Sequence, residues 1–173
     1  MNTVFDETQR SHAPNEFIIR AMKDGDAEAV AGMVRGLAEH IGSGIVPKLT
    51  GETLLQSRDL IDTVVAEADG RVLGAGLGLM TFSTWRGAKG LYVVDLFVLP
   101  EERGKNIGPL LMRLLAKRAA ARGASFIKLE VDRGNGGAER FYARLGFAKK
   151  EQDRLHILEQ DGFDKFIATG DDI

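Results

Sequence analysis

The chain has 173 residues, a length that suits one domain with its own hydrophobic core. Hydrophobic residues make up 44% of it and charged residues 28%, which excludes wholesale disorder, and the net charge of −2 argues against general binding to nucleic acid or to membranes. Cysteine is absent, which excludes disulfides, a thiolate nucleophile and zinc–thiolate sites and fits a cytoplasmic protein.

Hydrophobic periodicity predicts strands and helices in alternation, in a single mixed α/β domain over residues 16–173. Asp26 is expected to cap the first long helix, and Asp69-Gly70 is a strong hairpin signal. In the first half of the chain, the pattern predicts a loose tail at 1–15, a strand at 16–21, a helix from 27 to 41, a short helix near 50–55, and strands at 62–68, 71–82 and 90–99. The second half predicts a helix from 107 to 122, a strand at 126–131, a helix from 135 to 145, strands near 147–150 and 154–159, and a helix near 162–168.

The most informative stretch runs from Asp95 to Gly108. A buried strand ends at Pro100 and is followed by Arg-Gly-Lys-Asn-Ile-Gly at the start of a helix. Unpaired amides and the helix dipole make such a turn a binding site for phosphate. Segment 101–150 also carries a local charge of +7, whereas the rest of the chain carries −9, which indicates an anionic ligand bound at one place.

Two other phosphate motifs are excluded by their spacing. The pair Gly104-Lys105 is followed by Asn106 instead of Ser or Thr, so this is no Walker A loop. The glycines at 74, 76 and 78 lie inside a strand pattern, where they favour close approach of a neighbouring backbone or ligand. An ordinary strand-to-helix turn carrying surface charge is the alternative for the loop itself.

The chain resembles the GNAT superfamily of N-acetyltransferases in two motifs that come in the expected order. The acetyl-CoA signature R/Q-x-x-G-x-G/A reads here as Arg103-x-x-Asn106-x-Gly108. Asn135 and the segment 141–147 are similar to the family's N-x-x-A-x-x-F-Y-x-x-x-G-F. Segment 91–98 looks most like the spermidine/spermine branch, and the resemblance covers residues 60–157.

This resemblance implies a mostly antiparallel sheet flanked by helices, with a splayed parallel strand pair that holds acetyl-CoA. The 90–99 and 126–131 strands would form that pair, with a bulge at 95–98 whose free backbone groups hold the pantetheine arm. The residues implied to bind the cofactor are Leu96, Phe97, Val98, Arg103, Gly104, Lys105, Asn106, Ile107, Gly108, Asn135 and Ala138.

The resemblance also implies that Tyr142 protonates the departing CoA thiolate; otherwise it is a core tyrosine. The general base stays open. The polyamine branch places a glutamate where this chain has Val94, which leaves Asp95 and Glu130 as the carboxylates near the reaction, with His156 as a weaker candidate. Asp95 is alternatively a structural acceptor, Glu130 a surface charge, and a chain of water molecules could replace any single base.

The acceptor pocket is expected from loop 42–48 and connection 83–89, with Trp85 and Arg86 as substrate-binding residues. Trp85 either stacks on a cation or covers the sheet edge. Asn106 tolerates a left-handed backbone better than most residues do, whereas Pro109 removes one amide donor. No metal, nucleic acid or membrane partner is expected, and a homodimer is compatible with the pattern.

These observations predict an acetyl-CoA-dependent N-acetyltransferase in which a small polyamine-like or amino-acid-like amine attacks the thioester directly. A protein N-terminus or a lysine side chain is the alternative acceptor. A CoA-binding regulatory module without turnover is the alternative of another class, favoured by Val94 and Asn106.

Overall fold

The computed structural model of the chain describes residues 9–10, 17–150, 156 and 158. The chain divides into two compact units, residues 1–139 and 140–173, and each is described by itself. The first unit holds the sheet, the helices that cover it and the loop expected to bind the cofactor. The elements in chain order are β1 (Gln9–Arg10), β2 (Ile18–Ala21), α1 (Ala27–Ile41), α2 (Gly51–Gln56), β3 (Asp62–Ala68), β4 (Arg71–Ser83), β5 (Ala88–Val98), α3 (Ile107–Ala121), β6 (Ala124–Leu129) and α4 (Gly136–Arg144).

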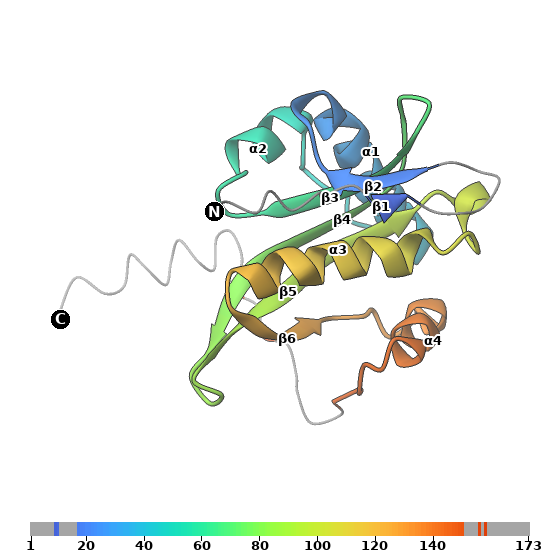
Figure 1. Cartoon of the computed structure of the whole chain (residues 1–173). Coiled ribbons are helices and arrows are strands. Elements are labelled where there is room, and N and C mark those ends of the chain that lie inside the picture. Colours follow the sequence, from blue (N-terminus) through green and yellow to red (C-terminus); the bar gives the residue numbers. More distant parts are fainter. Residues whose placement is uncertain (1–8, 11–16, 151–155, 157, 159–173) are drawn as a thin grey trace, which may run out of the picture. The chain divides into compact units, whose positions relative to one another are not determined.

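The strands form one sheet in the order β1-β2-β3-β4-β5-β6 (Figure 1). Every neighbouring pair is antiparallel except β5 and β6, which are parallel and connected through α3. The predicted fold class, a mostly antiparallel sheet with one parallel pair, is confirmed. The β3–β4 hairpin turns at Asp69 and Gly70, which both have positive φ, 51° and 78°, as the hairpin signal requires.

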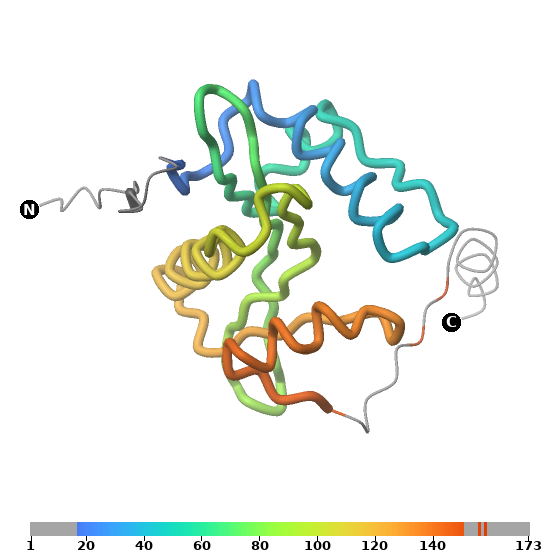
Figure 2. The backbone as a smooth tube through the Cα atoms, turned by 90° about the vertical axis from the view of Figure 1, so that its right-hand side faces the viewer, coloured from blue at the N-terminus to red at the C-terminus, as the bar shows by residue number. Residues whose placement is uncertain are grey.

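Helices α1 and α3 lie on opposite faces of the sheet (Figure 2). On the α1 face, Val30 and Met33 of the helix pack with Leu77 and Phe97 of the strands in a buried cluster. On the other face α3 comes close to β4, because a Cβ on Gly76 would lie only 3.0 Å from a methyl carbon of Leu115. Gly74 and Gly76 therefore let α3 approach, whereas Gly78 leaves room for Leu91 of β5; both are the close approach that glycines inside a strand predicted.

Three details differ from the sequence-based expectations. Gln9–Arg10 pair with β2 inside the segment expected to be a tail. Asp26 precedes α1, but its carboxylate does not cap that helix, because it accepts hydrogen bonds from the Lys23 amide and from Arg20 instead. Residues 147–150 are not a strand: Ala148 and the two lysines after it are exposed, and only one apolar side chain offers a face to bury.

The predicted strand at 154–159 and helix at 162–168 lie outside the described residues, apart from positions 156 and 158, which are in neither state. Within the described part of the chain, no helix has the length and apolar character needed to cross a bilayer.

Candidate active site

A bulge in β5 organises the centre of the candidate site. Leu77 of β4 lies opposite Asp95, and Gly78 lies opposite Val93, so Val94 is an extra residue without a partner on β4. In a regular strand, residues 92 and 95 would face opposite sides of the sheet. Here the inserted residue shifts the alternation, so Tyr92 and Asp95 share the face that carries Leu77 and α1.

The strands β5 and β6 separate directly beyond this point. Their pairing ends at Val93 and Leu129, whereas β5 continues to Val98. Residues 94–98 therefore have no partner on β6, and on that edge the Val98 carbonyl accepts a hydrogen bond from Arg103 instead. This edge fits the predicted role of Leu96, Phe97 and Val98 in holding the pantetheine arm, which stays a prediction.

A tyrosine, a lysine and a glutamate meet beside this opening. Tyr92 lies next to Lys128 across the parallel pair, and the Lys128 Nζ lies 5.2 Å from the centre of the Tyr92 ring. Glu130 directly follows β6 and interacts with the Tyr92 hydroxyl through a hydrogen bond. Burial raises the pKa of Tyr92, and the negative charges of Glu130 and Asp95 raise it further. Tyr92 is therefore a neutral donor at physiological pH.

Asp95 is the partly buried carboxylate of this face. Burial raises the pKa of its carboxyl group above the ordinary aspartate value. Among the described residues, no hydrogen bond or ion pair to the Asp95 side chain is found, so nothing in that part of the chain supports the alternative of a structural acceptor. Because its pKa is raised, this carboxylate accepts a proton more readily than an ordinary aspartate does.

The loop expected to bind pyrophosphate has the conformation that an anion site requires. Gly104 and Asn106 both have positive φ, 82° and 64°, and Asn106 is the residue that precedes the first turn of α3. Its side chain does not cap the helix, which leaves the amides of Ile107 and Gly108 without that partner. Pro109 supplies no amide. Asn106 thus holds the left-handed backbone that a glycine adopts without cost.

The two basic residues of the loop already have contacts within the protein. Arg103 donates from Nε to the Val98 carbonyl at 3.1 Å, and its guanidinium lies 5.7 Å from the centre of the Phe97 ring. Lys105 forms an ion pair with Glu102 at 2.9 Å. These contacts fix Arg103 at the end of β5, where its charge adds to that of the helix start.

The remaining predicted cofactor residues lie around α4. Asn135 accepts the Ala138 amide on Oδ1 at 3.0 Å and so caps the helix, a structural role that accompanies its predicted one. Tyr142 belongs to the second unit, where its ring packs edge-on against Phe141 and Phe147 at centroid distances of 5.0 and 5.5 Å. The roles of Asn135, Ala138 and Tyr142 in the reaction stay predictions.

The β4–β5 turn carries the two residues predicted to bind substrate. Trp85 is 99% exposed, so it covers no part of the sheet edge. Arg86 lies over the ring of Phe126 on β6, with its guanidinium carbon 4.9 Å from the ring centre. The Phe126 ring occupies the space above Gly90, where a Cβ would come within 2.4 Å of a ring carbon. Arg86 is thus held above β6, on the face that carries Lys128.

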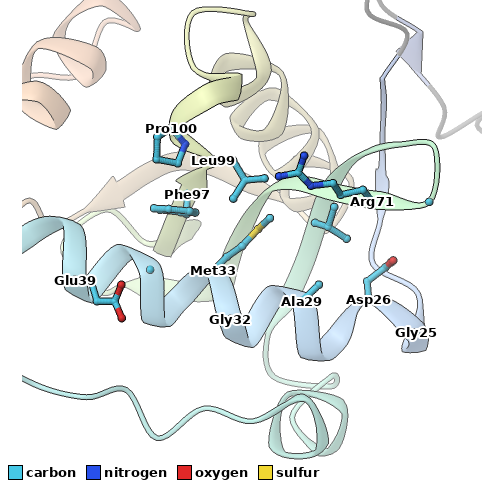
Figure 3. Close-up of a pocket in the computed structure, with 13 residues that line it drawn as sticks. Gly25, Asp26, Ala29, Gly32, Met33, Glu39, Arg71, Phe97, Leu99 and Pro100 are labelled. Atoms are coloured by element: carbon cyan, nitrogen blue, oxygen red, sulfur yellow. The ribbon is translucent and has the colours of Figure 1, made fainter.

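A cavity of about 730 Å³ lies beside α1, at the ends of β4 and β5 (Figure 3). Met33 of α1 points into it toward Phe97 and Leu99. Neither loop 42–48 nor connection 83–89 contributes to its lining, so this cavity does not test the predicted origin of the acceptor pocket. Its lining is formed by Gly25, Asp26, Ala29, Gly32, Met33, Gly36, Glu39, Gly70, Arg71, Val72, Phe97, Leu99 and Pro100. Within the described residues no group of three His, Cys, Asp or Glu side chains could hold a metal.

Sequence reasoning missed Tyr92 and Lys128 as site residues. Alternation predicts Tyr92 and Asp95 on opposite faces, and the extra residue Val94 that unites them leaves no distinct signature in an apolar run. The available signal was the pair Lys128 and Glu130, two residues apart on one predicted strand and therefore on one face.

Comparison with known proteins agrees with this geometry. The pattern of the Acetyltransferase (GNAT) family matches residues 42–147. The chain belongs to the GNAT family. It is 32% identical over 166 residues to the thialysine N-epsilon-acetyltransferase of Bos taurus, covering 89% of this chain and 93% of the relative. It is also 41% identical over 85 residues to the streptothricin acetyltransferase of Streptomyces lavendulae, covering 49% of this chain and 43% of the relative.

A solved acetyltransferase from Trypanosoma brucei shares the fold with a TM-score of 0.64 and 23% identity, over 82% of this chain and 99% of that one. The chain is therefore a GNAT acetyltransferase, an acyltransferase of the family that uses acetyl-CoA as its acetyl donor. The resemblance seen in the sequence motifs is confirmed.

Proposed function

We propose that this GNAT enzyme transfers the acetyl group of acetyl-CoA to the primary amine of a small molecule, on the sheet face that carries Tyr92 and Asp95. The observation that carries the proposal is the Asp95 carboxylate. It is partly buried beside an unpaired strand edge, its pKa is raised, and it lacks a hydrogen-bond donor among the described residues. The relatives named for small amines, thialysine and streptothricin, support an acceptor of the same kind.

The proposed reaction is a direct attack. The substrate ammonium first gives one proton to Asp95, and the neutral amine then attacks the thioester carbon. The second nitrogen proton leaves to solvent as the carbon–sulfur bond breaks to give the amide and CoA thiolate. Glu130, on the same face, holds the acceptor's positive charge before transfer. Tyr142 supplies the proton to the thiolate. A substrate ammonium with a pKa near that of lysine, about 10.4, is rarely neutral at pH 7, which is why a carboxylate base is needed.

Donor binding is proposed to use two features of the first unit. The amides of Ile107 and Gly108, with Arg103, meet the pyrophosphate at the start of α3. The open edge of β5 at residues 96–98 meets the amide groups of the pantetheine arm. Asn106 keeps the loop in its left-handed form, so it gives no support to the alternative of a CoA-binding module without turnover. A homodimer and a cytoplasmic location remain predictions.

The test is a multiple-turnover assay of free CoA with a panel of small primary amines. Because the chain contains no cysteine, the protein adds no thiol background to this readout. Asp95→Asn should lower kcat/KM by roughly 10²-fold or more, the scale of one acid–base group, without weakening acetyl-CoA binding. Asp59→Asn, an exposed aspartate on the loop before β3, is the matched control.

Two results would refute the proposal. If no amine in the panel supports CoA release beyond one equivalent per enzyme, the chain is not an acetyltransferase for small amines. If the folded Asp95→Asn variant turns over like the wild type, Asp95 is not the base.

A further inference from the structure

Two basic side chains, Arg86 and Lys128, lie on the face of the sheet that carries the proposed base. Phe126 and Lys128 are two residues apart on β6, so their side chains project from one side of the sheet. Glu130 directly follows β6 and interacts with the hydroxyl of Tyr92, the residue paired with Lys128. Arg86 is held over the Phe126 ring at 4.9 Å, and Lys128 is held over the Tyr92 ring at 5.2 Å. Both cations are thus positioned by aromatic rings at one end of the sheet face that carries Tyr92 and Asp95, which we call the acceptor face.

Neither cation is neutralised within the described part of the chain. No carboxylate oxygen there lies within 4.0 Å of Arg86 or Lys128, although Glu130 follows Lys128 by only two residues. The polar contacts of Arg86 are to the Ser83 hydroxyl, at 3.3 Å from its amide and 3.5 Å from its guanidinium. Glu130 instead engages the Tyr92 hydroxyl. The face therefore keeps its positive and negative groups apart.

This separation has a direction and a length. The basic end lies toward the β4–β5 turn and the acidic end toward the bulge, where Asp95 lies. Glu130 directly follows β6, and the two residue steps from Lys128 to Glu130 span about 6.7 Å of extended backbone. A ligand complementary to this face carries a carboxylate at one end and an ammonium at the other, separated by several methylene groups. The adjacent carboxylate and amine of a simple α-amino acid are too close together to match it.

We propose that Arg86 and Lys128 bind the carboxylate of the acceptor, and that they select amino acids with a side-chain amine over diamines. This inference rests on the proposed function, because it assigns the amine end of the ligand to Asp95 and Glu130. It makes Lys128 the specificity-determining residue, since its ammonium lies nearest the acidic end. Arg86, on the β4–β5 turn, adds a second positive charge for the carboxylate of the acceptor.

L-Lysine and cadaverine are matched probes, because they differ only in the α-carboxylate. The assay compares kcat/KM for the two acceptors in the wild type, in Lys128→Met and in Arg86→Met. We expect the lysine-to-cadaverine ratio to fall roughly tenfold or more in Lys128→Met through a higher KM for lysine, the scale of a charge-assisted hydrogen bond. Lys128→Glu should reverse the preference toward cadaverine, because the new carboxylate attracts its second ammonium.

Lys117→Met removes the same charge from an exposed position on α3, across the sheet, and controls for net charge. An unchanged lysine-to-cadaverine ratio in the folded Lys128→Met and Lys128→Glu variants would overturn the inference. So would a wild-type enzyme that acetylates cadaverine at least as well as lysine. Failure of the proposed function looks different, since the wild type would then acetylate neither probe nor any other small amine.

Discussion

The left-handed backbone of Asn106 makes the cofactor loop open to a direct test. This residue precedes α3 with φ 64° and ψ 13°, and its side chain does not cap the helix. Replacing it with Ala keeps the chain length and charge but removes a residue that tolerates this conformation. Replacing it with Gly removes the same amide group and adopts positive φ without cost. The two variants therefore differ in backbone strain.

The magnitude follows from the conformation. A left-handed backbone costs an ordinary residue about 1–2 kcal/mol, and Asn escapes part of this cost, so Asn106→Ala should lose about 1 kcal/mol relative to the wild type. If the loop keeps its shape, this loss lowers the melting temperature by about 2–4 °C for a domain of this size. If the loop relaxes, binding must restore it, and the Kd for acetyl-CoA rises about fivefold instead.

Thermal unfolding measures the loss of folding stability, and calorimetric titration with acetyl-CoA measures the loss of binding affinity. We expect the two losses to sum to about 1 kcal/mol for Asn106→Ala relative to the wild type, and to about 1–2 kcal/mol relative to Asn106→Gly. Equal melting temperatures and equal affinities in the two variants would refute the reasoning, because they would show that position 106 needs no left-handed backbone for folding or for binding.

Three further outcomes are expected. Because burial raises the pKa of Asp95, ionisation at pH 7 costs the folded state more than the unfolded chain, so Asp95→Asn should melt above the wild type there. That advantage should shrink as the pH falls through the raised pKa, and melting curves across pH in which the wild type is the more stable at pH 7 would contradict it. Tyr142→Phe should lower kcat and kcat/KM together by ~10²-fold with little change in acetyl-CoA affinity, and steady-state rates at wild-type level with chemistry rate-limiting would remove its acid role. Gly90→Ala should cost about 1–3 kcal/mol by chemical denaturation, because its Cβ would overlap the Phe126 ring, whereas Gly25→Ala, with open space around it, is the control; equal stability of the two variants would contradict this packing.

Much of the fold and of the cofactor loop could be predicted from local patterns. The turn at Asp69 and Gly70 and the helix after Asn106 each depend on a few neighbouring residues, which the sequence displays directly. The parallel pair was predicted because a helix connects its two strands. Strand alternation and helix periodicity predicted the other strands and helices of the first unit, apart from β1.

The acceptor face could not be predicted in the same way. Its composition depends on one extra residue, Val94, which turns Tyr92 to the side of Asp95, and on the pairing of Tyr92 with Lys128 across 36 positions of sequence. The expected side-chain cap at Asp26 failed because Arg20 on a neighbouring strand competes for the carboxylate. At the acceptor face a long-range contact overrides the local preference, whereas at Asp26 the competing partner lies only six residues away.

A crystal structure of the complex with acetyl-CoA tests the central claim most directly. We expect the pyrophosphate on the amides of residues 104–108, the pantetheine arm along the open edge of β5, and the thioester carbon within reach of the Asp95 carboxylate. Acetyl-CoA bound instead in the cavity beside α1, or with its thioester on the α3 side of the sheet, would contradict the site described for this enzyme.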